Sequence, residues 1–287
     1  MTHISEAPLL RLDQFGTVIV TGVDAKSFLQ GQLSFDLDQL TPARAELACC
    51  NSAQGRVQAV TWLIERGDAI ALLLPANMVD STLARLRKYV LRAKVKLEAG
   101  AERYAVFAVE GATLDAPERT HREIDDRSFV QWPGQPHRLL CITSVSAGTL
   151  ASPAQALSWH RADIEAGLPQ VYPQTHETFV AQMLNLDSLG GISFEKGCYT
   201  GQEIIARTHF RGAVKRRMFR FHAACPPPDP GERIVLGEQH AGDVVDAVGT
   251  LDGCELLAVV TLAHANEALR LQASAAALER LPLPYQV

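Results

Sequence analysis

The sequence predicts an α+β fold with a small all-β module at its C-terminal end. Strand-like and helix-like stretches alternate irregularly and are joined by hairpin turns, which is typical of α+β proteins rather than of doubly wound parallel sheets. Residues 225–231 contain four prolines, which predicts a stiff linker because proline suits neither a helix interior nor a central strand. Short strand-like runs with Gly and Asn turns follow it. At 287 residues the chain has room for two or three domains.

The N-terminal stretch predicts a strand, a helix and a hairpin. Residues 17–20 are β-branched and form a short strand, after which Asp24 is suited to begin a helix. Residues 51–55 have the composition of a turn. They separate an apolar run that ends at Cys50 from the strand-like residues 57–64, so we expect these two runs to pair as a hairpin.

A second helix is expected after the apolar strand at residues 69–74. Its apolar side chains recur every three or four residues, as on one face of an amphipathic helix: Val79, Leu83, Leu86 and Val90. The helix runs into residues 85–96, where six of twelve residues are basic and none is acidic. A second basic cluster comes later: Arg207, Arg211, Lys215, Arg216, Arg217 and Arg220. Each is either a solvated face, the commoner case, or a surface that binds a polyanion.

The helix expected from Ser152 carries two residues of interest. Ser152 and Pro153 have the residue types of an N-cap and a first helical position, and Gly167 is placed to end the helix. Trp159 and Glu165 lie within it. A tryptophan in such a helix is most often part of the core.

The most distinctive stretch is residues 190–207, a glycine-rich loop followed by a predicted helix. Thr200 and Glu203 have the spacing of a capping box, which predicts that Thr200 is the N-cap. Tyr199 and Ile204 have the spacing of the hydrophobic staple that accompanies such a cap. The register of the helix follows from these two signatures.

This register places Cys198 two residues before the predicted N-cap, beside unpaired N–H groups and the positive end of the helix dipole. Lys196 is close in sequence, and we expect both features to lower the pKa of the thiol. The simpler interpretation of Cys198 is a small buried hydrophobe. The glycines of the loop favour a reactive, presented thiol, because a buried cysteine needs no such backbone freedom.

Bulk properties exclude several classes of protein. The net charge of −5 gives no general attraction to nucleic acid, and no apolar run is long enough for a membrane helix. The N-terminus lacks the features of a signal peptide, so we expect a cytoplasmic protein. The six cysteines form no C-x-x-C pair and the nine histidines no metal-ligand spacing, so no metal site is expected. Nucleotide-binding, zinc-protease and serine-hydrolase motifs are absent.

Several of these segments together resemble a known family. K-G-C-Y-T-G-Q-E at residues 196–203 resembles the signature of the YgfZ family, folate-binding proteins related in fold to the T-protein (aminomethyltransferase) of the glycine cleavage system. N-L-D-S-L-G-G-I-S-F at residues 185–194, I-E-A-G-L-P at residues 164–169 and F-L-Q-G-Q-L at residues 28–33 are similar to that family as well. The order of the segments extends the resemblance over the whole chain.

The resemblance implies a T-protein-like fold of two interleaved, ferredoxin-like α+β units around a central cleft, with a small C-terminal β-barrel. On this basis we expect residues 1–48 with 152–212 to form the first unit, which carries the K-G-C-Y-T-G-Q-E motif. Residues 49–151 form the second unit, and residues 213–287 the barrel module.

The resemblance also implies a function, an accessory protein that binds tetrahydrofolate or a one-carbon derivative and assists the assembly or repair of iron–sulfur proteins. Its effect on tRNA modification is then indirect, through iron–sulfur enzymes as clients. Cys198 and Lys196 are the expected reactive pair. The expected folate contacts are the following: Trp159, Phe15, Glu165, Gln202, Glu203 and Arg207. An aromatic pair suits a flat pterin ring. We expect a monomer with no membrane contact.

Two other functions stay open. One is a folate-dependent aminomethyltransferase or other one-carbon transferase like the T-protein, which carries an aspartate just after its N-x-x-G-G turn. Here Gln58 and Ala59 occupy the matching positions, a departure that speaks against that activity. The other is an RNA-binding protein that uses the basic segments, although few aromatic residues lie among them and direct nucleic-acid binding is not expected.

Overall fold

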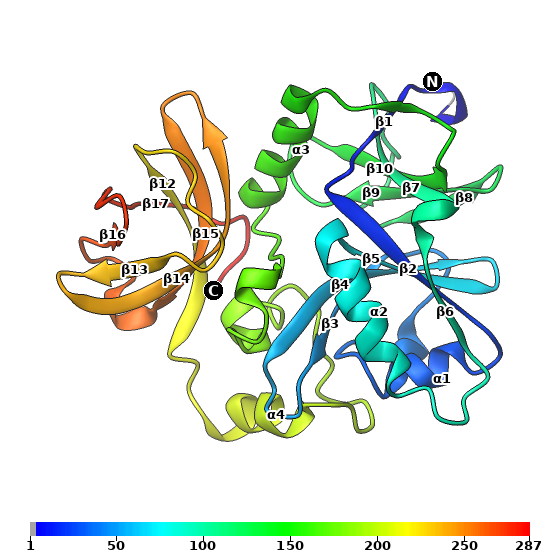
Figure 1. Cartoon of the computed structure of the whole chain (residues 1–287), viewed down its shortest axis with the longest axis horizontal. Coiled ribbons are helices and arrows are strands. Elements are labelled where there is room, and N and C mark those ends of the chain that lie inside the picture. Colours follow the sequence, from blue (N-terminus) through cyan, green and yellow to red (C-terminus); the bar gives the residue numbers. More distant parts are fainter. Residues whose placement is uncertain (1–3) are drawn as a thin grey trace.

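Three β-sheets organise the protein, whose computed structural model describes residues 4–287. Figure 1 shows the C-terminal sheet on one side and helix α3 (Pro153–Glu165) between that sheet and the rest of the chain. Ser152 and Gln155 form the capping box that begins α3, and Pro153 is its first residue, as predicted. This mixed, sheet-rich architecture confirms the α+β prediction. No helix within the described residues is long and apolar enough to cross a bilayer.

The first sheet has the strand order β3-β4-β5-β2-β6, with every neighbouring pair antiparallel. Its strands are β2 (Phe15–Thr21), β3 (Glu46–Asn51), β4 (Val57–Arg66), β5 (Ala69–Pro75) and β6 (Lys96–Ala99). Helix α1 (Ala25–Gln30) begins after Asp24, and α2 (Val79–Arg87) packs on β2 and β6. The hairpin and the amphipathic helix expected from the sequence are therefore present.

The second sheet has the order β11-β1-β7-β10-β9-β8, in which β1 and β11 pair in parallel. Its strands are β1 (Leu9–Arg11), β7 (Tyr104–Val109), β8 (His121–Ile124), β9 (Arg127–Trp132), β10 (Arg138–Ser144) and β11 (Thr149–Leu150). The expected domain limits stay a prediction. Residues 57–75, which we expected in the second unit with residues 104–150, lie instead in the sheet of β2.

The third sheet has the order β16-β13-β14-β15-β12-β17 and curls into a half-barrel. Its strands are β12 (Arg216–Ala223), β13 (Arg233–Leu236), β14 (Gln239–Thr250), β15 (Gly253–Thr261), β16 (Arg270–Leu271) and β17 (Glu279–Leu281). The prediction that residues 225–231 are a linker before this module is wrong. They connect β12 to β13 inside it, because proline also suits a connection that donates no hydrogen bonds to the sheet.

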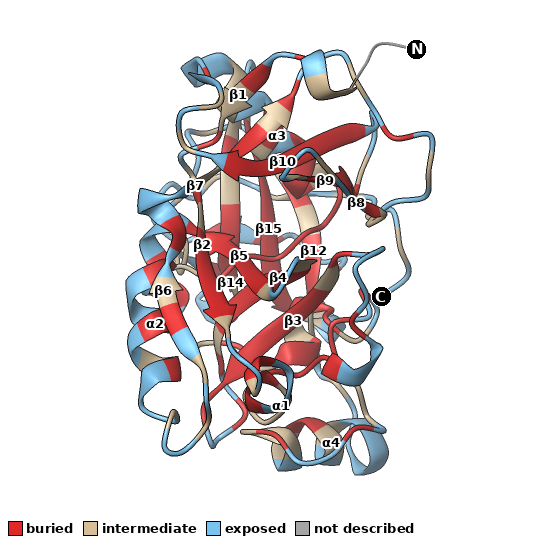
Figure 2. Cartoon of the chain, turned by 90° about the vertical axis from the view of Figure 1, so that its right-hand side faces the viewer, coloured by how far each residue is buried: buried red, intermediate tan, exposed pale blue. Residues whose placement is uncertain are grey.

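One hydrophobic core runs through all three sheets, and Figure 2 shows buried strands along the length of the molecule. The inward face of the third sheet contributes Met218, Val245, Val248, Leu257 and Val259 to this core. Its other face encloses a smaller core of its own, around Phe221 and Leu256. Because the sheets share buried side chains, the region where they meet is held in a fixed geometry.

Candidate functional site

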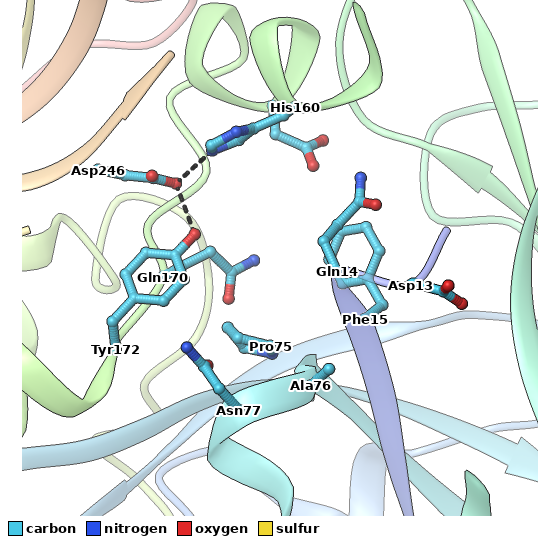
Figure 3. Close-up of a pocket in the computed structure, with 11 residues that line it drawn as sticks. Asp13, Gln14, Phe15, Pro75, Ala76, Asn77, His160, Gln170, Tyr172 and Asp246 are labelled. Carbon is cyan, nitrogen blue, oxygen red and sulfur yellow. Dashed lines mark hydrogen bonds and ion pairs between the residues drawn. The ribbon is translucent and has the colours of Figure 1, made fainter. Parts of the chain in front are cut away.

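A cavity of about 300 Å³ lies where the first sheet, α3 and the C-terminal sheet meet (Figure 3). Its walls come from the start of β2, the end of β5, α3 with the segment that follows it, and β14. The lining residues are Asp13, Gln14, Phe15, Pro75, Ala76, Asn77, His160, Asp163, Gln170, Tyr172 and Asp246. These stretches are far apart in the sequence. Of the expected site residues, Phe15 is the one that lines the cavity.

His160, Asp246 and Tyr172 form a hydrogen-bonded group on one wall (Figure 3). Nε2 of His160 lies 2.9 Å from Oδ2 of Asp246, and the Tyr172 hydroxyl donates to the same oxygen at 3.0 Å. Asp246 is 4% exposed and sits at a register shift of β14, a bulge that redirects its carboxylate. Burial lowers the pKa of His160, but the charge and hydrogen bond of Asp246 outweigh it and raise the pKa overall.

Phe15 is the outermost ring of an aromatic cluster. It meets Trp132 edge-on with 6.1 Å between centroids, and Trp132 lies 4.8 Å from Trp62 and 6.4 Å from Trp159. Trp159 itself does not line the cavity. It is buried behind Trp132, with the guanidinium carbon of Arg138 4.6 Å from its ring centroid. The structure therefore gives Trp159 a supporting position.

Asp163 is the buried carboxyl group of α3 that lines the cavity, and it is not among the residues expected from the sequence. Its Oδ1 accepts a hydrogen bond from Trp132 Nε1 at 2.8 Å and pairs with Nη2 of Arg138 at 2.9 Å. Burial raises the pKa of Asp163, against the opposing effect of Arg138. Helical spacing offered a signal, because residues three apart such as His160 and Asp163 share a face.

Glu165 lies on the other side of α3. Its Oε1 is 3.0 Å from Nε of Arg161 and 3.6 Å from Nη2 of Arg220, and it borders a separate cavity. With 3.6 residues per helical turn, the side chains at positions 163 and 165 point about 160° apart around the helix axis. The structure thus places Asp163, and not Glu165, at the central cavity.

Gln202, Glu203 and Arg207 lie on α4 (Gln202–Arg211), and none of them lines the central cavity. Figure 1 shows α4 at the end of the molecule away from α3. Glu203 and Arg207 are exposed, and Gln202 Oε1 accepts a hydrogen bond from the backbone N–H of Tyr199 at 3.3 Å. These residues belong to the surface around the K-G-C-Y-T-G-Q-E loop.

The predicted capping box at Thr200 is wrong. The N-cap of α4 is Gly201, in the left-handed conformation with φ of 82°, and no side chain caps the helix. The cause is a contact with the β3–β4 hairpin, since a Cβ on Gly201 would lie 2.5 Å from the carbonyl oxygen of Ser52. Only glycine fits this approach without strain, so the chain turns there, one residue later than local sequence predicts.

Lys196 is buried and does not serve Cys198. Its Nζ donates hydrogen bonds to the carbonyl oxygens of Gln30, Leu33 and Phe35 at 2.7, 2.8 and 2.7 Å. Burial lowers the pKa of Lys196 to about 8. The ammonium group therefore holds the K-G-C-Y-T-G-Q-E loop against the end of α1 and the residues that follow it. The residues next to Lys196 in the sequence did not indicate this role.

Cys198 is exposed, in contrast to four of the other cysteines, which are buried, and to half-buried Cys225. Burial raises the pKa of Cys49 and Cys141 to about 12. No group of histidine, cysteine and acidic side chains within residues 4–287 is arranged to hold a metal ion. Cys198 is thus the thiol that solvent reaches most freely.

The two basic clusters differ in their surroundings. In the later one, Arg216 pairs with Asp243 at 2.6 Å, Arg217 with Asp187 at 2.5 Å, and Arg220 with Glu255. Much of that cluster is therefore neutralised within the fold. In residues 85–96, Lys88, Arg92 and Lys94 are exposed, as expected of a solvated face.

Comparison with known proteins identifies the family. The tRNA-modifying protein YgfZ of Cronobacter sakazakii is 32% identical to this chain, and the match covers 97% of the chain and 93% of that protein. The chain belongs to the YgfZ family. The solved structure of the glycine cleavage system aminomethyltransferase T from Bartonella henselae superposes on this YgfZ family member with a TM-score of 0.71. It covers 97% of this chain and 86% of that protein at 14% identity, which confirms the T-protein-like fold. No family model matches the chain.

Proposed function

We propose that this YgfZ family member binds a reduced folate, tetrahydrofolate or a one-carbon derivative, in the central cavity. We further propose that it uses Cys198 in the assembly or repair of iron–sulfur proteins and thereby affects tRNA modification. The observation that carries the folate proposal is the cavity, in which the aromatic ring of Phe15 and several buried polar groups converge in an aminomethyltransferase-like fold. The name of the Cronobacter sakazakii relative supports the link to tRNA modification.

The cavity has a group suited to each part of a pterin, which has flat faces and a polar edge. Phe15 offers a stacking surface. Both contacts of the Asp163 carboxylate use Oδ1, which leaves Oδ2 to accept from ring N–H groups. Nε2 of Gln14 is buried without a partner among residues 4–287, and a ligand carbonyl would satisfy it.

The remainder of a folate also has space. A second cavity of about 550 Å³ shares Asp13, Phe15 and Ala76 with the first. Its walls are mostly apolar, as the aminobenzoyl part of a folate requires. Bound folate would supply the carrier for a one-carbon unit, while the protein's own groups hold it and exclude water.

Cys198 does not line either cavity, so we assign the thiol a separate role at the surface, where a client protein can reach it. Lys196 fixes the loop on one side of Cys198 and Gly201 on the other. The thiol is therefore presented from a fixed backbone. Folate and client would act at two places on the same molecule.

The aminomethyltransferase alternative has less support. The side chain of Gln58 is engaged at both ends, with Nε2 donating to Glu177 at 2.6 Å and Oε1 accepting from Nε of Arg85. An amide acts neither as an acid nor as a base at neutral pH, unlike the aspartate of the T-protein pattern.

Thermal unfolding with added ligand tests the folate proposal. Tetrahydrofolate at about 100 times its Kd should stabilise the folded state by about 2.7 kcal/mol, and single-stranded RNA should have no effect. Phe15→Leu and Asp163→Asn should reduce the ligand-induced rise in Tm, each measured against its own unliganded protein. Glu165→Gln, on the other side of α3, is the matched control and should keep the full rise. If Glu165→Gln abolished the rise while Asp163→Asn kept it, the cavity assignment would be wrong.

A further inference from the structure

Two thiols that the proposed function does not use lie close together in the C-terminal module, one on β15 and one in the connection after β12. The Sγ atoms of Cys225 and Cys254 are 4.0 Å apart. Cys254 lies at the start of β15, paired with Ala223 at the end of β12. Cys225 comes two residues after Ala223, and its N–H donates to the Ala223 carbonyl at 2.9 Å, which turns the chain back toward β15.

We propose that Cys225 and Cys254 form a reversible dithiol–disulfide site that reacts with low-molecular-weight disulfides. A disulfide bond is about 2.05 Å long, so the sulfurs must approach by roughly 2 Å. Cys254 is fixed by strand pairing, but Cys225 belongs to the connection between β12 and β13. The required movement therefore falls on a segment outside the strands.

The two thiols differ in access, and this assigns their roles. Cys225 is half-buried, whereas Cys254 is fully buried in the core of the half-barrel. Burial, together with the neighbouring Cys225, raises the pKa of Cys254 to about 12. Cys225 is thus the sulfur that an external reagent meets, and Cys254 is the resolving thiol.

With glutathione disulfide as the reagent, the exchange takes two steps. The thiolate of Cys225 attacks one glutathione sulfur, the reagent's S–S bond breaks, and the departing glutathione takes up the proton that Cys225 lost. Sγ of Cys254 then attacks Sγ of Cys225, displaces the second glutathione and transfers its proton to it. The protein loses two protons and two electrons, and glutathione disulfide takes them up to become two thiols.

The disulfide would close a loop over residues 226–253, which includes β13 and β14. Cross-linking restricts the unfolded chain, so the oxidised protein should have the higher Tm. Because β14 carries Asp246, the loop also includes one wall of the central cavity.

The test is oxidation of the full chain with glutathione disulfide, followed by acid quenching, alkylation and peptide mass spectrometry. Cys198→Ser serves as the background, because it removes the exposed thiol. We expect a Cys225–Cys254 cross-linked peptide, and a Tm that rises on oxidation and returns on reduction. In Cys254→Ala, glutathione should remain attached to Cys225, since no resolving thiol is left. In Cys225→Ser, Cys254 should stay reduced.

Two results would overturn the proposal. The first is that both thiols stay reduced, under conditions in which Cys198 of the unmodified protein becomes glutathionylated. The second is that Cys225 keeps a stable glutathione adduct although Cys254 is present. The first is read by comparing the Cys198→Ser protein with the unmodified chain, and the second on the Cys198→Ser protein alone, so neither depends on the folding of the Cys225 and Cys254 variants.

Discussion

The side chains of Lys196 and Cys198 are two residues apart and have opposite surroundings. The ammonium group of Lys196 is enclosed by three carbonyl oxygens, whereas the thiol of Cys198 is exposed. Because the ammonium group of Lys196 donates to three carbonyls, it has no donor left for the Cys198 thiol. Accessibility is what distinguishes this thiol from the other five.

Labelling tests this view of Cys198. Sub-stoichiometric alkylation near neutral pH, followed by peptide mass spectrometry, should modify Cys198 first, because the competing thiols are buried or half-buried. Cys225 is the internal comparison and should follow more slowly. Preferential labelling of Cys49 or Cys50, both buried, would contradict the assignment of Cys198 as the most accessible thiol.

The pair of His160 and Asp246 should make stability depend on pH. The folded-state pKa of His160 is raised above its ordinary value of 6.5, so its contribution is fully present below pH 6.5 and is lost as pH rises through the folded-state pKa. His160→Gln should therefore reduce the free energy of unfolding by roughly 1–3 kcal/mol below pH 6.5, and by less at higher pH. Urea unfolding across this range measures the effect.

A double-mutant cycle supplies the control. In an Asp246→Asn background, the pH dependence of the His160→Gln effect should lose its original sign, because burial then lowers the pKa of His160 without the opposing carboxylate. A pH dependence of unchanged sign and size without Asp246 would assign the effect to another group near His160, such as Asp163.

At this scale, the family resemblance named Phe15, Trp159 and Glu165 as expected folate contacts, and the structure separates the three. Phe15 and Asp163 line the cavity, whereas Trp159 is buried without lining it and Glu165 borders a separate cavity. The rotation of α3 about its axis depends on packing with β14 and β15, which contribute from far along the chain. Local sequence does not contain that information.

At the scale of elements, the β3–β4 hairpin and the start of α4 fit together through two glycines. A Cβ on Gly201 would lie 2.5 Å from the Ser52 carbonyl oxygen, and one on Gly55 would lie 2.7 Å from Cβ of Ile204. The hairpin and the amphipathic helix α2 were predictable, since their patterns are local. The start of α4 was not, because this tertiary contact overrides the capping signature.

Gly201→Ala tests the contact. The substitution adds a clash and a strained positive φ, so it should lower the free energy of unfolding by about 1–3 kcal/mol and increase hydrogen exchange in α4. Gly197→Ala is the matched control, since no atom lies within 4 Å of its added Cβ and its φ is not positive. Equal stability of the two variants would argue against the packing of hairpin and helix described above.

At the scale of the whole molecule, the cavity exists because the three sheets pack around one shared hydrophobic core. Its walls come from the first sheet, α3 and β14, so the site depends on how the C-terminal sheet docks. The sequence resemblance predicted the T-protein-like fold, and the structural match confirms it. The convergence of Asp163, His160 and Asp246 could not be read from the sequence, because two helical positions and a bulged strand meet only after docking.

The most direct test of the account is hydrogen exchange of the full chain with and without tetrahydrofolate. Ligand in the central cavity should protect amides around residues 13–15, 75–77, 160–172 and 246, and leave α4 unchanged. Protection confined to α4 and the loop of Cys198, or no protection at saturating ligand, would contradict the assignment of the folate site.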